Sequence, residues 1–485
     1  MMDITKIYQL YKKEILVYGD VIVDIYIEGS VSKISPEAPV PVLVVEKMRK
    51  KLGGAANVAE NLLSLGANVR VLGYSGQDEN GNWLLHRLQD IHADCRYFIQ
   101  FADYSTISKT RITSNKQQLI RYDIEKIYEP SFQYTEYIKK NVDCILENIS
   151  ALVISDYNKG AVTEVIAQIL ISEAKKRRIP VIVDPKGKNY YKYRDATLCT
   201  PNVKEINLLF DDDLIDDYAI KWKGETVIKD YHFDFLAITR SEKGIRLFSS
   251  DGMVDYPATC KDLIDVSGAG DTVVAILACA LACDMTVQIG CVLANLAASV
   301  VCSKYGTSVL TMEELLKQIA GDGKYKHIGI EENDYILKNL KQNNKKVVFT
   351  NGCFDLLHAG HVYLLNQAKS LGDVLIVAVN SDDSVKKNKG KKRPIISEQN
   401  RITMLCALEC VDYVILMNEK NPVSILKRIK PDIVVKGQDW EDKYMPEQTI
   451  VESYGGEIHF VPLKGKLSTT NIIRRIYECD DDFKK

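Results

Sequence analysis

The chain has 485 residues, of which 46% are hydrophobic and 26% charged, an ordinary composition for a soluble globular protein. The 63 Lys and Arg nearly balance the 65 Asp and Glu, and the formal charge of −2 argues against nucleic-acid binding through overall charge. The longest apolar run, Val273–Cys283, is well short of the ~20 residues that a membrane span needs. At roughly 100–200 residues per domain, this length predicts two to four domains.

The N-terminus and the cysteines predict a cytoplasmic protein. The first twenty residues have no apolar core followed by small residues, so we expect no secretory signal. The 12 Cys are scattered through apolar segments without a disulfide framework, and we expect buried thiols in a reducing cytosol. The chain has no CxxC and no HExxH pattern, which argues against a structural zinc site and a zinc hydrolase.

Short apolar runs alternate with helical patterns in the first part of the chain. Helical spacing marks Val162–Lys176, just before one of these runs. The alternation predicts an α/β fold with a parallel sheet covered on both faces. Its clearest strands are expected at residues 14–24, 151–157, 180–185 and 235–241.

The pattern changes near residue 320. A polar, glycine-containing stretch at 320–334 predicts a linker, followed by a short amphipathic helix with Ile336, Leu337 and Leu340 on one face. A second β–α series then begins, with strands expected at 347–349, 374–380, 413–417 and 433–437. We therefore predict a first domain at residues 1–320, a linker at 321–343 and a second domain at 344–485.

The motif DVSGAGDT at 265–272 precedes an apolar helix. Gly268, Ala269 and Gly270 are small, so a phosphate can approach the free backbone N–H groups at the helix start. Asp271 lies at the mouth of this anion hole, where a carboxylate can accept a proton from an attacking hydroxyl. The alternative is a glycine-rich turn in which Asp271 caps the helix.

An earlier motif, GGAANVAENLLSLGA at 53–67, favours sugar binding. Gly53 and Gly54 open a helix and allow a sugar to come close to the backbone, and Asn57 lies in the first turn. The run GDVIVD ends the expected first strand with Asp20 and Asp24, whose carboxylates suit bidentate binding of sugar hydroxyls. Solvated or capping acids are the alternative for both.

In this order, the motifs resemble those of the ribokinase-like (PfkB) carbohydrate kinases over roughly residues 12–318. The resemblance implies an α/β sandwich with a small β lid, ATP-dependent phosphorylation of a sugar hydroxyl, and Asp271 as the catalytic base. It also implies a homodimer, because kinases of this family often dimerise through the lid. The family's Asn-x-x-Glu motif matches Asn202, Val203, Lys204 and Glu205, which would bind ATP. By that match Asn202 and Glu205 would organise Mg²⁺ through its water shell, without a direct protein cage.

Further segments, at 33–42, 106–123 and 183–205, look like those of the heptose 7-phosphate kinases of lipopolysaccharide core synthesis. A substrate that already carries a phosphate needs cations in its binding site. The candidates are Lys109, Arg111, Arg121 and Lys186. A salt-bridged surface strand is the alternative interpretation of these residues.

The second domain opens with TNGCFDLLHAGHVYLL at 350–365. His358 and His361 follow the turn between a strand and a helix, and their spacing lets both point toward one ligand. Imidazoles can hydrogen-bond ATP phosphates and stabilise the charge that develops on phosphorus and on the departing pyrophosphate. No general base is required, because the attacking phosphate is already an anion. Metal binding and simple packing are the alternatives.

The run GCFDLLHAGH carries the HxGH signature of the cytidylyltransferase-like nucleotidyltransferases, which have a Rossmann-type α/β fold. The resemblance covers about residues 344–478. It implies a loop that closes over the triphosphate and a second phosphate-binding helix start, although a solvated basic loop remains the alternative for the former. The ATP-binding residues expected on this basis are Gly352, Phe354, Asp355, Lys391, Arg393, Ser468, Thr469 and Thr470, with Arg474 one turn further on and Lys436 and Asp439 as further candidates.

Together the two halves look like the bifunctional enzymes of ADP-heptose synthesis. The resemblance implies phosphorylation of D-glycero-β-D-manno-heptose 7-phosphate at O1 with Mg²⁺ and ATP. It also implies adenylylation of heptose 1-phosphate to ADP-heptose and pyrophosphate, with a separate heptose bisphosphate phosphatase acting between the steps. Two alternatives stay open: another sugar kinase fused to a transferase that makes a CDP-alcohol or coenzyme precursor, and a binding sensor without catalysis.

Overall fold

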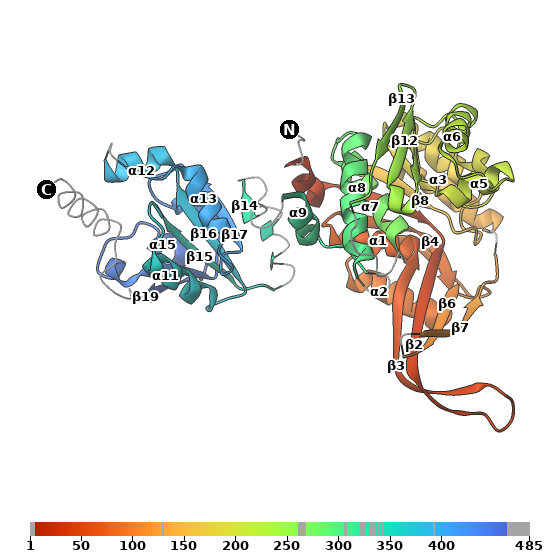
Figure 1. Ribbon diagram of the computed structural model, residues 1–485, viewed down its shortest axis with the longest axis horizontal. Coiled ribbons are helices and arrows are strands. Elements are labelled where there is room, and N and C mark those ends of the chain that lie inside the picture. The colour runs from red at the N-terminus through yellow and green to blue at the C-terminus, as the bar shows by residue number, and fades with distance from the viewer. Residues whose placement is uncertain are drawn as a thin grey trace. The chain divides into compact units, whose positions relative to one another are not determined.

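The computed structural model describes residues 5–115, 117–128, 130–259, 268–304, 308–320, 326–329, 336–337, 340–341, 344–390 and 393–462. The chain forms two compact units, residues 1–318 with two sheets and residues 319–485 with one (Figure 1). Most of the expected linker lies outside the described residues, although Ile336, Leu337 and Leu340 are buried. No helix in the described ranges is long and apolar enough to cross a membrane.

The first unit contains a nine-stranded sheet with the order β13-β12-β11-β10-β9-β8-β1-β4-β5. The strands from β5 across to β11 are parallel, and β12 and β13 add an antiparallel edge. The predicted parallel sheet is therefore confirmed apart from that edge. The strands are β1 (Glu14–Gly19), β4 (Asn68–Gly76), β5 (Asp94–Phe101), β8 (Ile149–Ser155), β9 (Val181–Asp184), β10 (Leu198–Cys199), β11 (Phe235–Thr239), β12 (Ile245–Ser249) and β13 (Gly252–Tyr256).

Helices cover the sheet of the first unit. One core, which includes Leu16, Tyr18 and Leu152, joins the sheet to α3 and α4, while α7 contacts β8 and β9 and packs against α1 and α8. Burial of α7 on nearly every side explains its uninterrupted apolar sequence. The helices are α1 (Ala55–Ser64), α2 (Glu79–Asp90), α3 (Phe132–Ile145), α4 (Glu164–Lys176), α5 (Val203–Phe210), α6 (Asp217–Tyr231), α7 (Ala269–Ala282), α8 (Val287–Cys302) and α9 (Met312–Ala320), with short 3₁₀ helices at Thr5–Lys12, Tyr190–Tyr193 and Ser241–Lys243.

A second, four-stranded sheet in this unit has the order β3-β2-β6-β7, and we call it the lid. Its strands are β2 (Val21–Ile34), β3 (Pro41–Gly54), β6 (Ser108–Ser114) and β7 (Gln117–Ile124). The β2–β3 hairpin projects away from the central sheet (Figure 1). Burial falls along β2, from buried residues at its start to exposed residues at its far end.

The expected single strand at residues 14–24 is wrong, because the chain changes sheets at Asp20. A Cβ on Gly19 would lie 1.9 Å from the carbonyl oxygen of Ser155, so only glycine fits where β1 ends. β2 then leaves for the lid and carries Asp24 with it. An unbroken apolar pattern does not reveal such a bend, since both strands are buried on both sides of it.

The second unit contains a six-stranded parallel sheet with the order β14-β17-β16-β15-β18-β19. The four strands predicted here are confirmed, three of them with the expected bounds. The strands are β14 (His327–Ile328), β15 (Val347–Gly352), β16 (Val374–Asn380), β17 (Tyr413–Met417), β18 (Ile433–Gly437) and β19 (Glu457–Val461). The helices are α11 (Ala359–Lys369), α12 (Asp382–Lys389), α13 (Glu398–Cys406), α14 (Val423–Ile429) and α15 (Gln448–Ser453), with a 3₁₀ turn at Gln438–Trp440.

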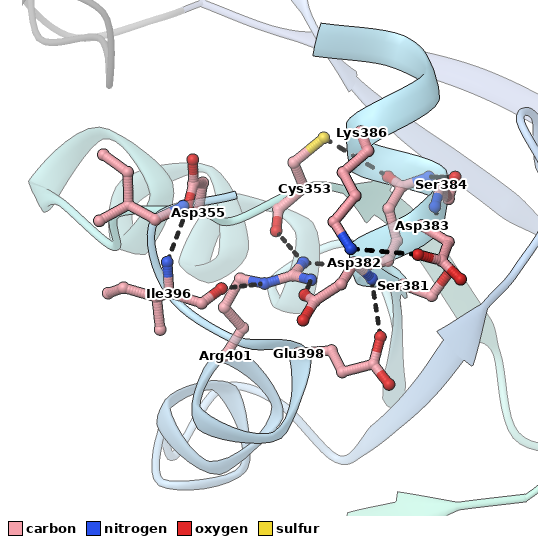
Figure 2. A network of polar contacts seen from close by, with 12 residues as sticks. Cys353, Asp355, Ser381, Asp382, Asp383, Ser384, Lys386, Ile396, Glu398 and Arg401 are labelled. Atoms are coloured by element: carbon pink, nitrogen blue, oxygen red, sulfur yellow. Dashed lines mark hydrogen bonds and ion pairs between the residues drawn. The ribbon is translucent and has the colours of Figure 1, made fainter. Parts of the chain in front are cut away.

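A fully buried arginine, Arg401 on α13, ties three segments of this unit together (Figure 2). Its guanidinium donates to the carbonyl oxygens of Cys353, Asn380 and Ile396 at 2.6, 2.7 and 3.0 Å. It also forms an ion pair with Asp382 at 2.7 Å. Since the five fixed N–H donors of a guanidinium suit several acceptors at once, this side chain satisfies carbonyls that would otherwise be buried without partners.

We predict that Arg401→Met lowers the free energy of unfolding of the second unit by about 3–5 kcal/mol, because three carbonyls and one carboxylate lose their partner. Denaturant titration followed by hydrogen exchange in peptides around residues 353, 380 and 396 measures the change. Lys386→Met is the matched control, since Lys386 pairs with Asp383 only at the exposed surface of α12 and should cost less than about 1 kcal/mol. Equal destabilisation by the two substitutions would contradict the role given to Arg401.

Candidate active sites

A pocket in the first unit opens where β8 and β9 end and α7 begins. Parallel strands present their carboxyl ends at one edge of a sheet, which is where α/β proteins bind ligands. The pocket joins residues from distant parts of the sequence, namely Asp156, Tyr157, Asp184, Pro185, Lys186, Thr200, Asn202, Glu205, Thr239, Gly268, Gly270, Asp271, Val273 and Val274.

Asp271 lies in the first turn of α7, beside the expected anion hole. Gly268 caps the helix with a φ of 82°, a left-handed conformation that favours glycine. A Cβ on Gly270 would meet nothing within 4 Å, so the pocket is open at this point. Residues 260–267 lie outside the described ranges, which leaves residues 268–272 as the described part of the motif.

The carboxylate of Asp271 is buried and held by two donors. Asn57 on α1 donates its amide to Oδ2, and the hydroxyl of Tyr157 donates to Oδ1 at 2.7 Å. Burial raises the pKa of Asp271 to about 6, while these two hydrogen bonds favour the charged form and oppose the rise. A carboxylate with this pKa is ionised at neutral pH and still basic enough to accept a proton.

The Asn-x-x-Glu residues form a capping box at the start of α5. The Asn202 side chain accepts from the Glu205 backbone N–H at 3.0 Å, and Glu205 accepts from the Asn202 backbone N–H at 2.9 Å. Val203 and Lys204 do not line the pocket, and Lys204 is exposed. Asn202 and Glu205 therefore cap α5, and the Glu205 side chain still lines the pocket.

Lys186 lies beside the expected ATP residues rather than beside the other candidate cations. Its ammonium donates to the second carboxylate oxygen of Glu205 at 2.6 Å. Burial works against its positive charge, but the carboxylate dominates and raises the pKa of Lys186. The structure thus separates Lys186 from the lysine and arginines of the lid with which it was grouped.

The lid brings the remaining candidate cations to one side of Asp271. Asp24 on β2 forms an ion pair with Arg111 on β6. Lys109 lies two residues before Arg111 and therefore on the same face of the strand. Arg121 on β7 faces Arg111 across the ladder and pairs with Asp123. Arg111 and Arg121 therefore have carboxylate partners, and an incoming anion would compete with those partners.

The two glycines before α1 leave room for these acids. A Cβ on Gly53 would lie 2.4 Å from Oδ2 of Asp24, and one on Gly54, whose φ is +57°, would lie 2.3 Å from the carbonyl oxygen of Asp20. Asp20 itself accepts three backbone N–H groups, from Tyr157, Lys159 and Ala161. Its described contacts hold the 157–161 loop, so contact with a sugar stays only a prediction for Asp20.

Sequence reasoning missed several residues of this pocket. Burial raises the pKa of Asp184 well above its usual range, and the nearby carboxylates of Glu205 and Asp271 raise it further. Asp156 is buried with Lys192 and Tyr193 as ion-pair and hydrogen-bond partners. The signal in the sequence is an acid at the end of each buried strand, in the runs ISDY and VIVDP.

In the second unit, His358 and His361 stack at the start of α11. Their ring centroids are 3.9 Å apart with an interplanar angle of 25°, and Phe354 lies against His361 at 5.2 Å. The Nδ1 atom of each imidazole is buried and has no hydrogen-bond partner in the described structure. These unpartnered atoms show that the pair is not simply a satisfied core feature.

Both imidazoles are uncharged at neutral pH. Burial lowers the pKa of His358, and it lowers that of His361 to about 4, with His358 and Lys389 adding repulsion. Each neutral ring has one donor and one acceptor nitrogen, so the pair can donate hydrogen bonds to phosphate without bringing a full charge.

Asp355 anchors the segment that follows the basic run. It is buried and accepts from the backbone N–H groups of Ile395 and Ile396 at 2.7 and 3.2 Å, and it pairs with Arg393. Gly352 ends β15, where a Cβ would lie 3.1 Å from the Phe354 ring. The described contacts therefore give Asp355 and Phe354 supporting roles beside the histidines.

The other expected nucleotide residues divide into two groups. Lys436, at the end of β18, is buried and binds Asn351 at 2.7 Å and Glu447 at 2.6 Å, whereas Asp439 pairs with Lys443 at the surface. Asn351 and Glu447 were missed. The rest lie outside the described residues, namely Lys391, Ser468, Thr469, Thr470 and Arg474.

Comparison with known proteins gives both units a family. Residues 12–314 match the model of the pfkB family carbohydrate kinases, and residues 349–475 match the cytidylyltransferase-like model. Among solved structures, phosphofructokinase-2 from Escherichia coli has a TM-score of 0.54 at 19% identity, covering 64% of this chain and 98% of its own. A ribokinase from Arabidopsis thaliana, solved with ribose and ATP, has a TM-score of 0.52 at 18% identity, covering 63% and 98%. These two likenesses establish the ribokinase-like fold.

Relatives that span both units have the same two-part organisation. The bifunctional protein HldE of Geobacter metallireducens is 41% identical over 472 residues, covering 95% of each chain. That of Proteus mirabilis is 42% identical over 469 residues, covering 96% of this chain and 98% of its own. The match runs through the kinase pocket, the histidine pair and the segment between them. The chain therefore belongs to the family of bifunctional HldE proteins, and it is a carbohydrate kinase joined to a nucleotidyltransferase.

Proposed function

We propose that the chain catalyses two ATP-dependent steps of ADP-heptose synthesis. The first unit phosphorylates O1 of D-glycero-β-D-manno-heptose 7-phosphate, and the second joins ATP and D-glycero-β-D-manno-heptose 1-phosphate into ADP-heptose and pyrophosphate. One observation carries this proposal. HldE proteins match the chain over nearly its whole length, and the chain has a buried carboxylate, Asp271, at the start of α7 and a histidine pair at the start of α11.

In the kinase reaction Asp271 is the base. Its carboxylate accepts the proton of the sugar O1–H as that oxygen attacks the γ-phosphorus, while N–H groups at the start of α7 face the transferred phosphoryl group. Asp24 binds sugar hydroxyls, and Lys109 and Arg111 hold the 7-phosphate. The ion pair of Arg111 with Asp24 and the contact of Lys109 with the Tyr157 ring support that role, because they keep the cations in place until an anion binds.

Oxygen donors around the pocket suit Mg²⁺. Glu205 has both carboxylate oxygens engaged by Lys186 and the Asn202 backbone, which favours contact with the ion through water. No group of three or more acidic, histidine or cysteine side chains arranged to cage a metal occurs in the described residues. When bound with ATP, Mg²⁺ would neutralise charge on the phosphates. Asn202 and Glu205 would position it, and Lys186 would meet the phosphate oxygens.

In the adenylyl transfer the attacking heptose 1-phosphate is already an anion, so the histidines have no proton to remove. His358 and His361 donate hydrogen bonds to the ATP phosphates and stabilise the charge that moves onto pyrophosphate. Their low pKa values support this assignment, since neutral rings remain donors across the physiological pH range. A separate phosphatase removes the 7-phosphate between the two steps, in the same cytoplasmic compartment.

The choice of nucleotide tests the proposed second step against the alternative of a CDP-product enzyme. Purified protein with heptose 1-phosphate and Mg²⁺ should release pyrophosphate with ATP, and at least tenfold more slowly with CTP. Measurement of pyrophosphate together with identification of the sugar nucleotide by mass spectrometry checks the result. Release with CTP alone would overturn the ADP-heptose assignment.

Substitution of one residue in each unit tests the separation of the two activities and excludes a non-catalytic sensor. Asp271→Asn should reduce kinase turnover by about 10²–10⁴ and leave adenylyl transfer intact, because the amide cannot accept the proton. His361→Ala should reduce adenylyl transfer by about 10²–10³ and leave the kinase intact. Loss of both activities in either variant, with the circular dichroism spectrum unchanged, would contradict independent sites.

The lid supports a homodimer. Its strands expose several large apolar side chains, and exposed apolar surface can mark an association site. They include Ile34, Val44, Val45, Met48, Ile120 and Tyr122. We expect sedimentation velocity at micromolar concentration to give a dimer, and the double substitution Val44→Lys, Met48→Lys to give a monomer. A wild-type chain that sediments as a monomer would sink this part of the proposal.

A further inference from the structure

Tyr157 lies in a loop whose backbone is fixed at several points. Its own N–H and those of Lys159 and Ala161 all donate to the carboxylate of the buried Asp20, at 2.8 to 3.0 Å. The preceding residue, Asp156, donates its N–H to the carbonyl of Asp184 at 3.0 Å, which ties the loop to the end of β9. The Tyr157 side chain therefore projects into the pocket from a well-braced backbone.

The two parts of this side chain contact two different functional groups. The hydroxyl donates to Oδ1 of Asp271 at 2.7 Å. The ring face receives the ammonium group of Lys109, which lies 5.3 Å from the ring centroid, a cation–π distance. Since burial raises the pKa of the phenol well above its usual range, the hydroxyl keeps its proton and acts only as a donor to the carboxylate.

We propose that Tyr157 is a positioning residue of the kinase, whose hydroxyl keeps the base Asp271 ionised and aimed and whose ring holds Lys109 over the sugar-phosphate site. This inference rests on the proposed function, because it takes Asp271 as the base and Lys109 as a cation for the substrate's phosphate. The Tyr157 side chain thereby positions both the base, Asp271, and a cation that binds the substrate, Lys109.

The charges around Asp271 make the contribution of the hydroxyl measurable. Burial is the largest influence and raises the pKa; Asp24 on β2 raises it too, and Asp184 at the end of β9 is a further nearby acid. Lys109 on β6 lowers it, as do the hydrogen bonds from Asn57 and Tyr157. A hydrogen bond to the charged form lowers a pKa, so removing the Tyr157 hydroxyl must raise the pKa of Asp271.

Tyr157→Phe removes the hydroxyl and keeps the ring. In the wild-type chain the kinase kcat/KM for heptose 7-phosphate should fall as the pH drops through about 6, the pKa of Asp271. In Tyr157→Phe that acid limb should move up by about one pH unit, because a hydrogen bond to a charged group is worth roughly that much. Above pH 8 the two profiles should converge, and the KM for heptose 7-phosphate should stay unchanged.

Tyr157→Leu removes the ring as well. It should show the same shift of the acid limb together with a several-fold rise in the KM for heptose 7-phosphate, since Lys109 loses its cation–π partner. The difference between the two variants separates the effect of the hydroxyl from that of the ring. A merely structural tyrosine would lower the whole profile equally in both variants, without moving the limb.

Tyr134→Phe is the matched control. The Tyr134 hydroxyl on α3 is buried in the same unit and has no hydrogen-bond partner in the described structure, so its removal should leave both the pH profile and the KM unchanged. A Tyr157→Phe profile that superimposes on the wild-type profile, or a limb that moves to lower pH, would overturn the inference.

A substrate-free measurement keeps this result distinct from failure of the proposed function. Carbon-13 NMR of the aspartate carboxyls, with the Asp271 signal identified by its loss in Asp271→Asn, reports the pKa of Asp271 directly. We expect that pKa to rise by about one unit in Tyr157→Phe. A wild-type chain that does not phosphorylate heptose 7-phosphate would refute the proposed substrate, whereas an unchanged Asp271 titration would refute the role of Tyr157.

Discussion

Both candidate sites follow from one constraint of parallel β-sheets, which is that all their strands end at the same edge. In the first unit, β8 and β9 deliver Asp156 and Asp184 to that edge, where α7 adds the positive end of its dipole. In the second unit, β15 and β18 deliver Asn351 and Lys436 in the same way. The geometry of the sheet therefore brings together residues that are far apart in the sequence.

The two candidate ATP sites differ in the side chains that line them. The kinase pocket buries several carboxylates, and burial, with some repulsion from neighbouring acids, raises the pKa of both Asp184 and Asp271. The transferase site uses two stacked imidazoles whose pKa values are lowered by partial burial. The difference matches the chemistry. A sugar hydroxyl gives its proton to a base as its oxygen attacks the phosphorus, whereas a sugar phosphate attacks as the anion it already is.

Sequence patterns predicted the elements that are buried on both faces, because continuous apolar runs leave little choice of structure. The strands at 374–380, 413–417 and 433–437 have the expected bounds for that reason. The same logic failed at residues 14–24, where two buried strands of different sheets meet at Gly19 and Asp20. A change of sheet requires a partner, here Ser155, that lies far along the chain.

Site residues were predictable where a local motif defines them and not where a distant contact does. Asp271, His358 and His361 each lie at the start of a helix that follows a recognisable turn. The sequence shows that Lys186 is charged but not that Glu205 is its partner. Likewise, nothing in the run ISDY indicates that Tyr157 donates a hydrogen bond to Asp271, which lies 114 residues further along the chain. Arg401 is similar, since a charged residue on a short helix is normally expected at the surface.

The strand β2 runs without a break from the central part of the kinase unit to the far end of the lid. The strand begins at Val21, one residue after the acid that braces the 157–161 loop, carries Asp24 beside the sugar site, and ends among the exposed residues of the lid. The proposed sugar contact, Asp24, and one residue of the proposed association surface, Ile34, therefore lie on the same strand. If both proposals hold, exchanging the lid for that of another sugar kinase would replace residue 24 together with the association surface, so sugar specificity and subunit pairing would change together.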